Sequence, residues 1–337
     1  MIWNIFSDPH LGVGRQAHTT AESSKRLDKA LFNAAMQAKS EEHPNIIAGD
    51  LFDKTFNSER VICQGIAVAA GNTVTLAGNH DETNREGTTC SLEVVQQAGC
   101  HVLRNKKVGG NAVFQPAENI FAVPHTTTQE LFDEALNYAV TLGQLAKGNN
   151  YLFLHCNRGS PIGDKSDSTL YVTDEQEDEL LKHFTRIFYG HEHGHKVLKG
   201  GRVVVIGNTH PTSFSDVSDK FRIELNTKTD EMQVINIWDA KQLYLELEVG
   251  TPLTTQGEQQ FILVKGSATR TETAAYIEQC WEAFPSAYAI RPMVTFPEEV
   301  VTKAQAAEPV NLLQMIETDL EGTNMLELFK ELKHATN

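Results

Sequence analysis

The sequence predicts an α/β fold in which two β-sheets form a sandwich flanked by helices, followed by a small α+β domain and C-terminal helices. Three observations favour this fold. Short apolar runs of strand length alternate with amphipathic helical patterns over residues 1–235. A polar, threonine-rich stretch at 252–256 then precedes a second, shorter strand–helix–strand pattern. The 337 residues are enough for one large and one small domain.

The first part of the chain contains the longer series of elements. Helices are expected at 23–38, 59–70, 91–98, 129–146 and 174–183; in the first, Leu27, Leu31 and Ala34 recur at helical spacing. Strands are expected at 2–6, 46–48, 74–76, 102–103, 112–114, 120–123, 151–154, 186–189, 203–206, 220–225 and 232–237, with the three between 102 and 123 antiparallel. Helices that separate strands in this way predict sheets sandwiched by helices.

The remaining residues predict a second unit. We place the boundaries at 1–250, 251–300 and 301–337, with a strand at 259–264, a helix at 272–284 and a strand at 288–296. A linker at 303–309 leads to expected helices at 310–319 and 324–333, which carry apolar faces. These faces either pack onto the small domain or dock onto a partner protein.

Composition narrows the functional classes. The formal charge of −15 argues against a broad basic surface that holds nucleic acid, so any contact with DNA must be local, metal-assisted or shared with a partner. The apolar stretches are far too short to span a bilayer, and no membrane association is expected. Five scattered cysteines without a CxxC pair, and no signal-peptide pattern, predict a cytoplasmic protein with reduced thiols.

Metal-ligand side chains follow the apolar runs. The strings are Asp8-Pro9-His10, Gly49-Asp50, Gly78-Asn79-His80-Asp81, His155, Gly190-His191-Glu192-His193 and Gly207-Asn208-Thr209. A two-metal hydrolytic site needs a carboxylate that bridges two ions, with imidazole and amide ligands around it. The three glycines that precede ligands, Gly49, Gly78 and Gly190, are expected where the backbone turns sharply. The pattern predicts hydrolysis of a phosphate ester.

These strings, D-x-H, G-D-x-x-D, G-N-H-D, H and G-H-x-H in this order, resemble the calcineurin-like metallophosphoesterases. The resemblance implies one ion held by Asp8, His10 and His193, a second held by Asn79, His155 and His191, and Asp50 as the bridge. It also implies that His80 helps the leaving oxygen depart as a proton donor, a role worth roughly 10²–10⁴-fold in rate. The alternative is a structural His80 oriented by Asp81; Asp81 is otherwise expected to support the ligands from behind.

Finer features resemble the SbcD-type DNA repair nucleases, in compact or phage-encoded form. They are Ser7-Asp8-Pro9-His10-Leu11-Gly12, Gly49-Asp50-Leu51-Phe52-Asp53 and the segment 206–216, which departs from the family pattern because Asn208-Thr209 replaces Ser-Pro. The resemblance implies a two-manganese nuclease that acts as a 3′ to 5′ exonuclease on duplex DNA ends and an endonuclease on single strands and hairpins. It further implies a DNA-capping small domain, a homodimer, and terminal helices that bind an SbcC-type ATPase. The ligand types also suit Mg²⁺, Fe²⁺ and Zn²⁺.

Other residues and functions stay open. Loop cations and a rim histidine are candidate substrate contacts: Arg15, Arg85, Arg158, Lys165, Lys196, Arg202 and His195. For Asp53 we favour helix capping over a supporting role at the site. A phosphodiesterase or phosphatase acting on a small molecule or phosphoprotein would keep every ligand, although the second domain argues against it. A binding scaffold with an inactive site is disfavoured because the ligand set and His80 are complete.

Overall fold

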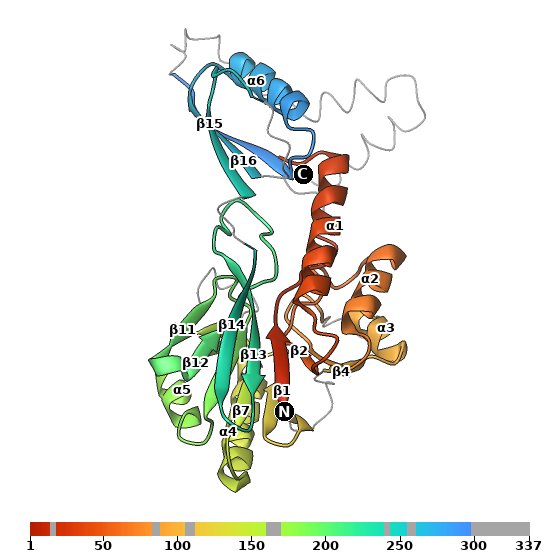
Figure 1. Ribbon diagram of the computed structural model, residues 1–337, viewed down its shortest axis with the longest axis vertical. Helices are drawn as coiled ribbons and strands as arrows, with labels where there is room; N and C mark the ends of the chain where they lie inside the picture. Colours follow the sequence, from red (N-terminus) through yellow and green to blue (C-terminus); the bar gives the residue numbers. More distant parts are fainter. Residues whose placement is uncertain are drawn as a thin grey trace, which may run out of the picture.

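Two six-stranded sheets stack face to face in the computed structural model, which describes residues 1–13, 18–82, 88–104, 112–159, 170–238, 243–254 and 261–297 (Figure 1). The first sheet runs β14 (Glu231–Trp238), β13 (Lys220–Asn226), β1 (Ile2–Phe6), β2 (Asn45–Ile47), β3 (Thr73–Leu76), β4 (His101–Leu103). The second runs β11 (Lys196–Leu198), β12 (Val203–Val205), β10 (Arg186–Gly190), β7 (Tyr151–His155), β6 (Ile120–Val123), β5 (Phe114–Ala117). The predicted α/β sandwich is confirmed.

Helices cover the outer faces of both sheets. The apolar cluster outside the first sheet takes residues from α1 (Ala21–Ala38), α2 (Glu59–Ala69) and α3 (Ser91–Gln97). The cluster outside the second takes residues from α4 (Gln129–Leu145) and α5 (Asp174–Leu180). A third cluster fills the space between the sheets, where the rings of Phe153 and Phe188 stack with centroids 4.8 Å apart. Within the described residues, no helix is long and apolar enough to cross a membrane.

Local sequence explains how these elements begin and why they are buried. Thr20 and Ser23 form a reciprocal capping box that starts α1, and Leu27 and Leu31 then lie on its buried face. Four of the five residues of β1 are buried because this strand has covered sheet faces on both sides. The strands β1, β2 and β3 are parallel, as are β7 and β10, so their carboxyl ends meet along one edge.

One expected pairing is wrong. The strand at 102–103 was expected to be antiparallel with its neighbours, but β4 pairs in parallel with β3; of the three strands expected to be antiparallel, β5 and β6 do pair in this way. The helix α3 lies between β3 and β4 and carries the chain back, which makes parallel pairing possible. The sequence analysis did not predict three short strands, because two or three residues show no periodic pattern. They are β8 (Asn157–Arg158), β9 (Tyr171–Val172) and β11.

A separate three-stranded parallel sheet forms the second unit. It consists of β15 (Tyr244–Glu248), β16 (Phe261–Ser267) and β17 (Ala289–Thr295), with α6 (Arg270–Ala283) between the last two. In sequence, the boundary placed between residues 250 and 251 therefore lies between two strands of this sheet, because β15 precedes it. The sequence analysis missed β15, whose alternating pattern is short. The helices expected at 310–319 and 324–333 lie outside the described residues.

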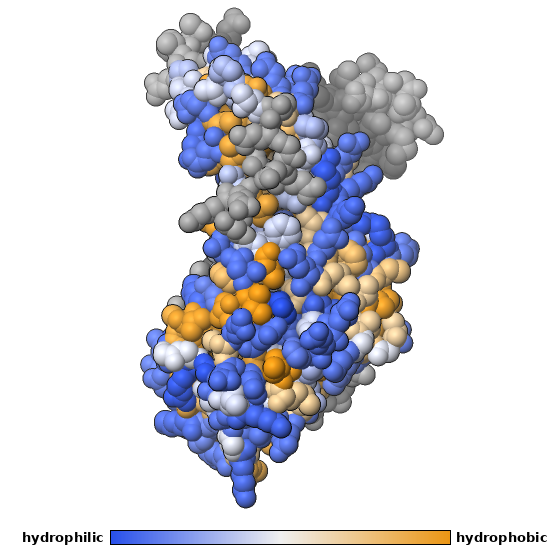
Figure 2. Space-filling model, viewed as in Figure 1, coloured by the Kyte–Doolittle hydropathy of each residue, from blue (hydrophilic) through white to orange (hydrophobic). Residues whose placement is uncertain are grey.

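The small sheet is fixed against α1 and the loop that follows β12. Phe261, Tyr288 and Ala289 belong to the same apolar cluster as the buried face of α1. The Arg26 guanidinium donates to the carbonyl of Ala287 at 3.0 Å, and the Tyr244 hydroxyl donates to the carbonyl of Ser213 at 2.9 Å. The face in Figure 2 is largely hydrophilic, with apolar side chains gathered over α2 and α3 and near β14.

Removing the buried ring that joins the two units should destabilise the protein. Phe261 is 1% exposed, so Phe261→Ala should lower the free energy of unfolding by about 3–5 kcal/mol, measured by urea denaturation. The matched control is Phe296→Ala at a ring that is 45% exposed, with an expected loss below about 1 kcal/mol. Equal losses for the two variants would contradict a shared core.

Candidate metal centre

The predicted ligands come together at the edge where the strands of both sheets end. Each follows or completes one of the parallel strands: Asp8 and His10 follow β1, Asp50 follows β2, Asn79 follows β3, His155 completes β7, and His191 and His193 follow β10. Asp8, His10, Asp50 and His155 are buried, while the other three are partly exposed. The centre therefore has a buried floor and an accessible side.

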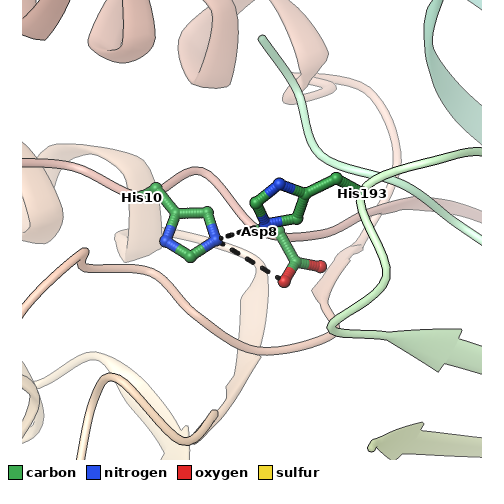
Figure 3. Close-up of side chains that lie close together, drawn as sticks. All are labelled: Asp8, His10 and His193. Atoms are coloured by element: carbon green, nitrogen blue, oxygen red, sulfur yellow. Dashed lines mark hydrogen bonds and ion pairs between the residues drawn. The ribbon is translucent and has the colours of Figure 1, made fainter. Parts of the chain in front are cut away.

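The first cluster contains Asp8, His10 and His193 (Figure 3). The Nε2 atoms of His10 and His193 lie 2.9 Å apart, and His10 Nε2 lies 3.9 Å from Asp8 Oδ1. Burial lowers the pKa of His10 to about 3, so its ring is neutral and offers a lone pair. Two facing ring nitrogens and a carboxylate form a donor set that suits a divalent cation.

The second cluster contains Asp50, His155 and His191. His155 Nδ1 donates to the carbonyl of Ala48 at 2.8 Å, which orients the ring and turns Nε2 toward Asp50 Oδ2, 3.2 Å away. The Asn79 side-chain oxygen lies 3.1 Å from His155 Nε2 and 3.0 Å from His191 Nδ1. An amide oxygen between two imidazole nitrogens completes this second donor set.

Asp50 lies between the two clusters. Its Oδ2 atom is 3.2 Å from His155 Nε2 in one cluster and 3.8 Å from His10 Nε2 in the other. Its Oδ1 atom accepts the backbone N–H of His80 at 3.0 Å, which holds the carboxylate in place. This position fits the bridging role, which stays a prediction.

The charges of the buried groups fit a pair of cations. Burial raises the pKa of Asp8. Burial alone would also raise the pKa of Asp50, but the positive charge of His155 outweighs it and holds that pKa below its ordinary value. In return, Asp50 raises the pKa of His155 to about 10 despite burial. Buried charges are costly unless they are paired or bind metals, and oxygen and imidazole donors suit divalent ions. The two clusters together fit a dinuclear metal site.

The ligands also carry backbone strain. Asp8, His10, Asp50 and His191 have φ values of 52°, 47°, 48° and 82°, in the left-handed region that side chains usually avoid. Each such residue costs on the order of 1–3 kcal/mol and persists only where the surrounding structure enforces it. The concentration of this strain at four ligands indicates that the positions are constrained by function.

Only one of the three glycines has the conformation expected for it. Gly49 has φ 111°, and a Cβ there would lie 1.9 Å from His155 Nδ1. Gly78 and Gly190 have no positive φ, so a sharp turn is the wrong explanation for them. A Cβ would lie 2.1 Å from Asp50 Oδ1 at Gly78 and 2.2 Å from the Ala48 carbonyl at Gly190. Close packing around the ligands requires these two glycines.

His80 lies beside the first cluster, its ring centroid 5.1 Å from that of His10. Its Nδ1 atom is 2.8 Å from the carbonyl of Asp53, so a backbone oxygen, and not the Asp81 carboxylate, orients the ring. Burial would lower the pKa of His80, but the charge of Asp50 and the bond to Asp53 raise it overall. The ring can therefore hold a proton at Nε2, as the proton-donor role requires; the role itself stays a prediction.

Asp81 supports the loops of the centre. Its carboxylate accepts backbone N–H groups from Leu51, Phe52 and Gly78 at 3.2, 3.0 and 3.0 Å. Burial and the nearby Asp50 raise its pKa to about 7. These bonds tie the loop after β2 to the loop after β3, as expected for a residue that supports the ligands from behind.

Helix capping, the role favoured for Asp53, is wrong. The N-cap of α2 is Ser58, and Asp53 Oδ1 instead lies 3.6 Å from His10 Nδ1. His10, Asp53 and His80 together form a third group that could hold a metal ion. The spacing of the G-D-x-x-D string is the signal that could have placed Asp53 next to the centre.

The sequence analysis missed a buried ion pair behind His193. The Lys220 ammonium is fully buried and pairs with Asp216 Oδ1. The other carboxylate oxygen, Oδ2, lies 3.8 Å from His193 Nδ1 and accepts from Asn208 Nδ2 at 2.6 Å. A buried lysine needs such a partner because desolvation lowers its pKa. Asp216 is thereby held where its carboxylate faces the far side of the His193 ring.

The described candidate substrate contacts each interact with another group of the protein. The Arg158 guanidinium forms two hydrogen bonds with buried Glu177, at 2.6 and 3.0 Å. His195 Nδ1 lies 3.1 Å from the Ile206 carbonyl, and its ring packs 4.7 Å from that of Phe221. Lys196 pairs with Glu192 at 2.8 Å, and Arg202 donates to the carbonyl of Phe184 at 3.0 Å. Three others, Arg15, Arg85 and Lys165, lie outside the described residues.

Comparisons with known proteins bear on the family. A family model described as calcineurin-like phosphoesterase matches residues 4–195, more than half of the chain. Among solved structures, a Staphylococcus aureus protein described as a "putative 5'-nucleotidase", in complex with alpha-ketoglutarate, is similar at 14% identity and a TM-score of 0.40. The match covers 70% of this chain and 52% of that one, so this chain spans about half the length of that protein. No curated protein matches the chain.

Weakening the support behind His193 should weaken metal binding. Asp216→Asn should lower the affinity for Mn²⁺ by about 10–100-fold, measured by isothermal titration calorimetry, because the carboxylate no longer faces the ligand ring. It should also lower the free energy of unfolding by about 3–5 kcal/mol, because Lys220 loses its partner.

A double variant separates the two effects. Asp216→Asn with Lys220→Met removes both buried charges, so stability should recover while the loss of Mn²⁺ affinity remains. Asp174→Asn, an exposed carboxylate on α5, is the matched control and should change neither quantity. Recovery of Mn²⁺ affinity together with stability would mean that Asp216 acts on folding alone.

Proposed function

Because the chain belongs to the calcineurin-like phosphoesterase family, we propose that its metal-dependent phosphoesterase activity is directed at the phosphodiesters of DNA. The proposed enzyme is an SbcD-type nuclease, acting as a 3′ to 5′ exonuclease on duplex ends and as an endonuclease on single strands and hairpins. Mn²⁺ is the proposed metal, with Mg²⁺ as the alternative, since carboxylate, amide and imidazole ligands suit both.

Each residue of the centre has a separate role in the proposed hydrolysis. Asp8, His10 and His193 would hold one ion, Asn79, His155 and His191 the other, and Asp50 would bridge them. Two divalent ions supply Lewis-acid polarisation of the phosphate and a nucleophile at neutral pH. The chain itself fixes the ligands from behind through Asp81 and Asp216, so little rearrangement is needed when substrate binds.

His80 is proposed as the group that protonates the leaving oxygen. The Asp53 carbonyl occupies its Nδ1 atom, so Nε2 is the nitrogen left for substrate. His80 is partly exposed on the accessible side of the centre, while its backbone N–H is tied to Asp50. A proton donor must lie beside the reacting phosphate, and this placement supports that role.

The observation that carries the choice of DNA is the small parallel sheet beside the centre. It is joined to the loop behind His193, because the Tyr244 hydroxyl donates to the carbonyls of Ser213 and Asp216. A phosphatase for small molecules needs no such second unit, whereas a nuclease can use it to cover DNA. The strings Ser7–Gly12 and Gly49–Asp53 support the same choice.

Two associations belong to the proposal. A homodimer would place two centres on one DNA. An SbcC-type ATPase would control access to DNA and supply binding surface that this acidic chain lacks. The residues expected to bind it, within 301–337, lie outside the described part of the chain.

Substitutions should separate proton donation from metal binding. His80→Gln should lower the hydrolysis rate by about 10²–10⁴-fold while Mn²⁺ affinity by calorimetry stays close to that of the wild type. Asp50→Ala should abolish both, because it removes the bridge. His101→Gln, an exposed histidine on β4, is the control for a histidine change. Joint loss of activity and metal binding in His80→Gln would exclude the proton-donor role.

The substrate is tested by a direct comparison. End-labelled duplex DNA and bis-p-nitrophenyl phosphate, a generic diester, would be incubated with Mn²⁺ and either the wild type or His80→Gln. We expect shortening of the duplex from its 3′ ends and loss of that activity in the variant. Turnover of the generic diester with intact DNA would contradict the nuclease while leaving the phosphoesterase in place, and would favour a small-molecule or phosphoprotein substrate.

A further inference from the structure

A pocket of about 260 Å³ lies between α1 and the loop that leads into α2. Three cationic side chains line it: Lys25 from α1, Lys54 from the loop and Arg60 from α2. Phe56, also in the lining, is 49% exposed, so its ring is accessible to a ligand. We call this feature the α1–α2 pocket.

The α1–α2 pocket is positively charged although the chain carries −15. Among the described residues that line it, the one carboxylate, on Asp28, is buried; it accepts the backbone N–H of Gly12 at 3.0 Å and pairs with Arg60. Among the described residues, Lys25 and Lys54 have no ion-pair partner, so two positive charges remain for a ligand. Two such positive charges in one pocket of a strongly acidic chain favour the binding of an anion there.

The α1–α2 pocket shares a wall with the metal centre. The loop after β2 lines the pocket through Lys54 and Phe56. Asp53, which directly precedes Lys54 in this loop, contacts His10 through its carboxylate and His80 through its backbone carbonyl. From the same loop, the Thr55 hydroxyl donates to the carbonyl of His80 at 3.3 Å. A chain-like anion whose scissile phosphate lies at the centre can therefore continue across this loop into the pocket.

We propose that the α1–α2 pocket is a subsite for single-stranded nucleic acid, in which Lys25 and Lys54 bind a backbone phosphate and Phe56 stacks on a base. Cations that follow the backbone, combined with an exposed aromatic ring, are how single strands are bound without sequence preference. The proposal rests on the proposed nuclease function and deepens it: the preferred substrate is a strand that extends several nucleotides from the cleaved bond.

The test compares a long substrate with a short one. The kcat/KM values for a single-stranded 12-mer of thymidylate and for the dinucleotide TpT would be measured with Mn²⁺, and their ratio taken. In Lys25→Gln/Lys54→Gln this ratio should fall roughly tenfold, and the salt dependence of 12-mer cleavage should weaken by about one power per lysine. Phe56→Ala should lower the ratio by about fivefold to a hundredfold through lost stacking.

A charge-matched control accompanies these variants. Lys147→Gln/Lys228→Gln removes two exposed lysines that lie outside the pocket, and it should keep the wild-type ratio. Melting temperatures of all variants would verify folding, and Phe56→Ala tests the pocket without any change of charge. The three substitutions in the pocket are at exposed side chains, so the fold should tolerate them.

The outcomes distinguish this inference from the proposed function. An unchanged ratio in both pocket variants, or a wild type that cleaves the 12-mer no faster than TpT, would overturn the subsite while leaving DNA cleavage in place. A wild type that hydrolyses bis-p-nitrophenyl phosphate but neither nucleic acid would overturn both. A fall in the ratio in the pocket variants, but not in the control, would support the subsite.

Discussion

The structure depends on the bonds that tie the two sheets together at the edge where their parallel strands end. The Asp8 carboxylate, after β1, accepts the backbone N–H of His191, after β10, at 3.1 and 3.0 Å. In the opposite direction, His155 Nδ1 on β7 donates to the Ala48 carbonyl after β2. Both bonds join groups of one sheet to groups of the other, so the ligands move only if the sandwich moves. This rigidity is what a preorganised site for charge requires.

These bonds come with energetic costs that the rest of the fold offsets. Two buried carboxylates, a buried imidazole whose pKa is lowered by desolvation and four left-handed ligand residues are each unfavourable in isolation. Three apolar clusters, one between the sheets and one outside each, supply the stabilisation that holds them. Divalent cations would remove much of the electrostatic part. The apoprotein is therefore expected to be the less stable form, as linkage requires for any ligand that binds only the folded state.

The positions of the candidate ligands were predictable from the sequence because each follows or completes an apolar strand. This local signal placed Asp8, Asp50 and His155 correctly at one edge of the sandwich. Asp216 and Lys220 could not be placed, because their role arises from a buried ion pair whose effect on His193 is visible only in three dimensions. Strand β15 was missed for a related reason. Five alternating residues predict a strand only weakly, and this segment forms a strand because it pairs with β16. Local patterns thus predict elements and ligands, while tertiary contacts determine supports and boundaries.

The distribution of charge matters more for function than its total. A net charge of −15 would repel a polyanion from most of the surface. Two features oppose this repulsion: a centre whose donors suit two divalent cations, and the α1–α2 pocket with two lysines free of ion pairs among the described residues. Both border the loop that carries Asp53 and Lys54, so the two features lie along one path among the described residues. For the proposed nuclease, weak binding elsewhere would disfavour occupation of DNA along its length and would favour strands that can enter this path.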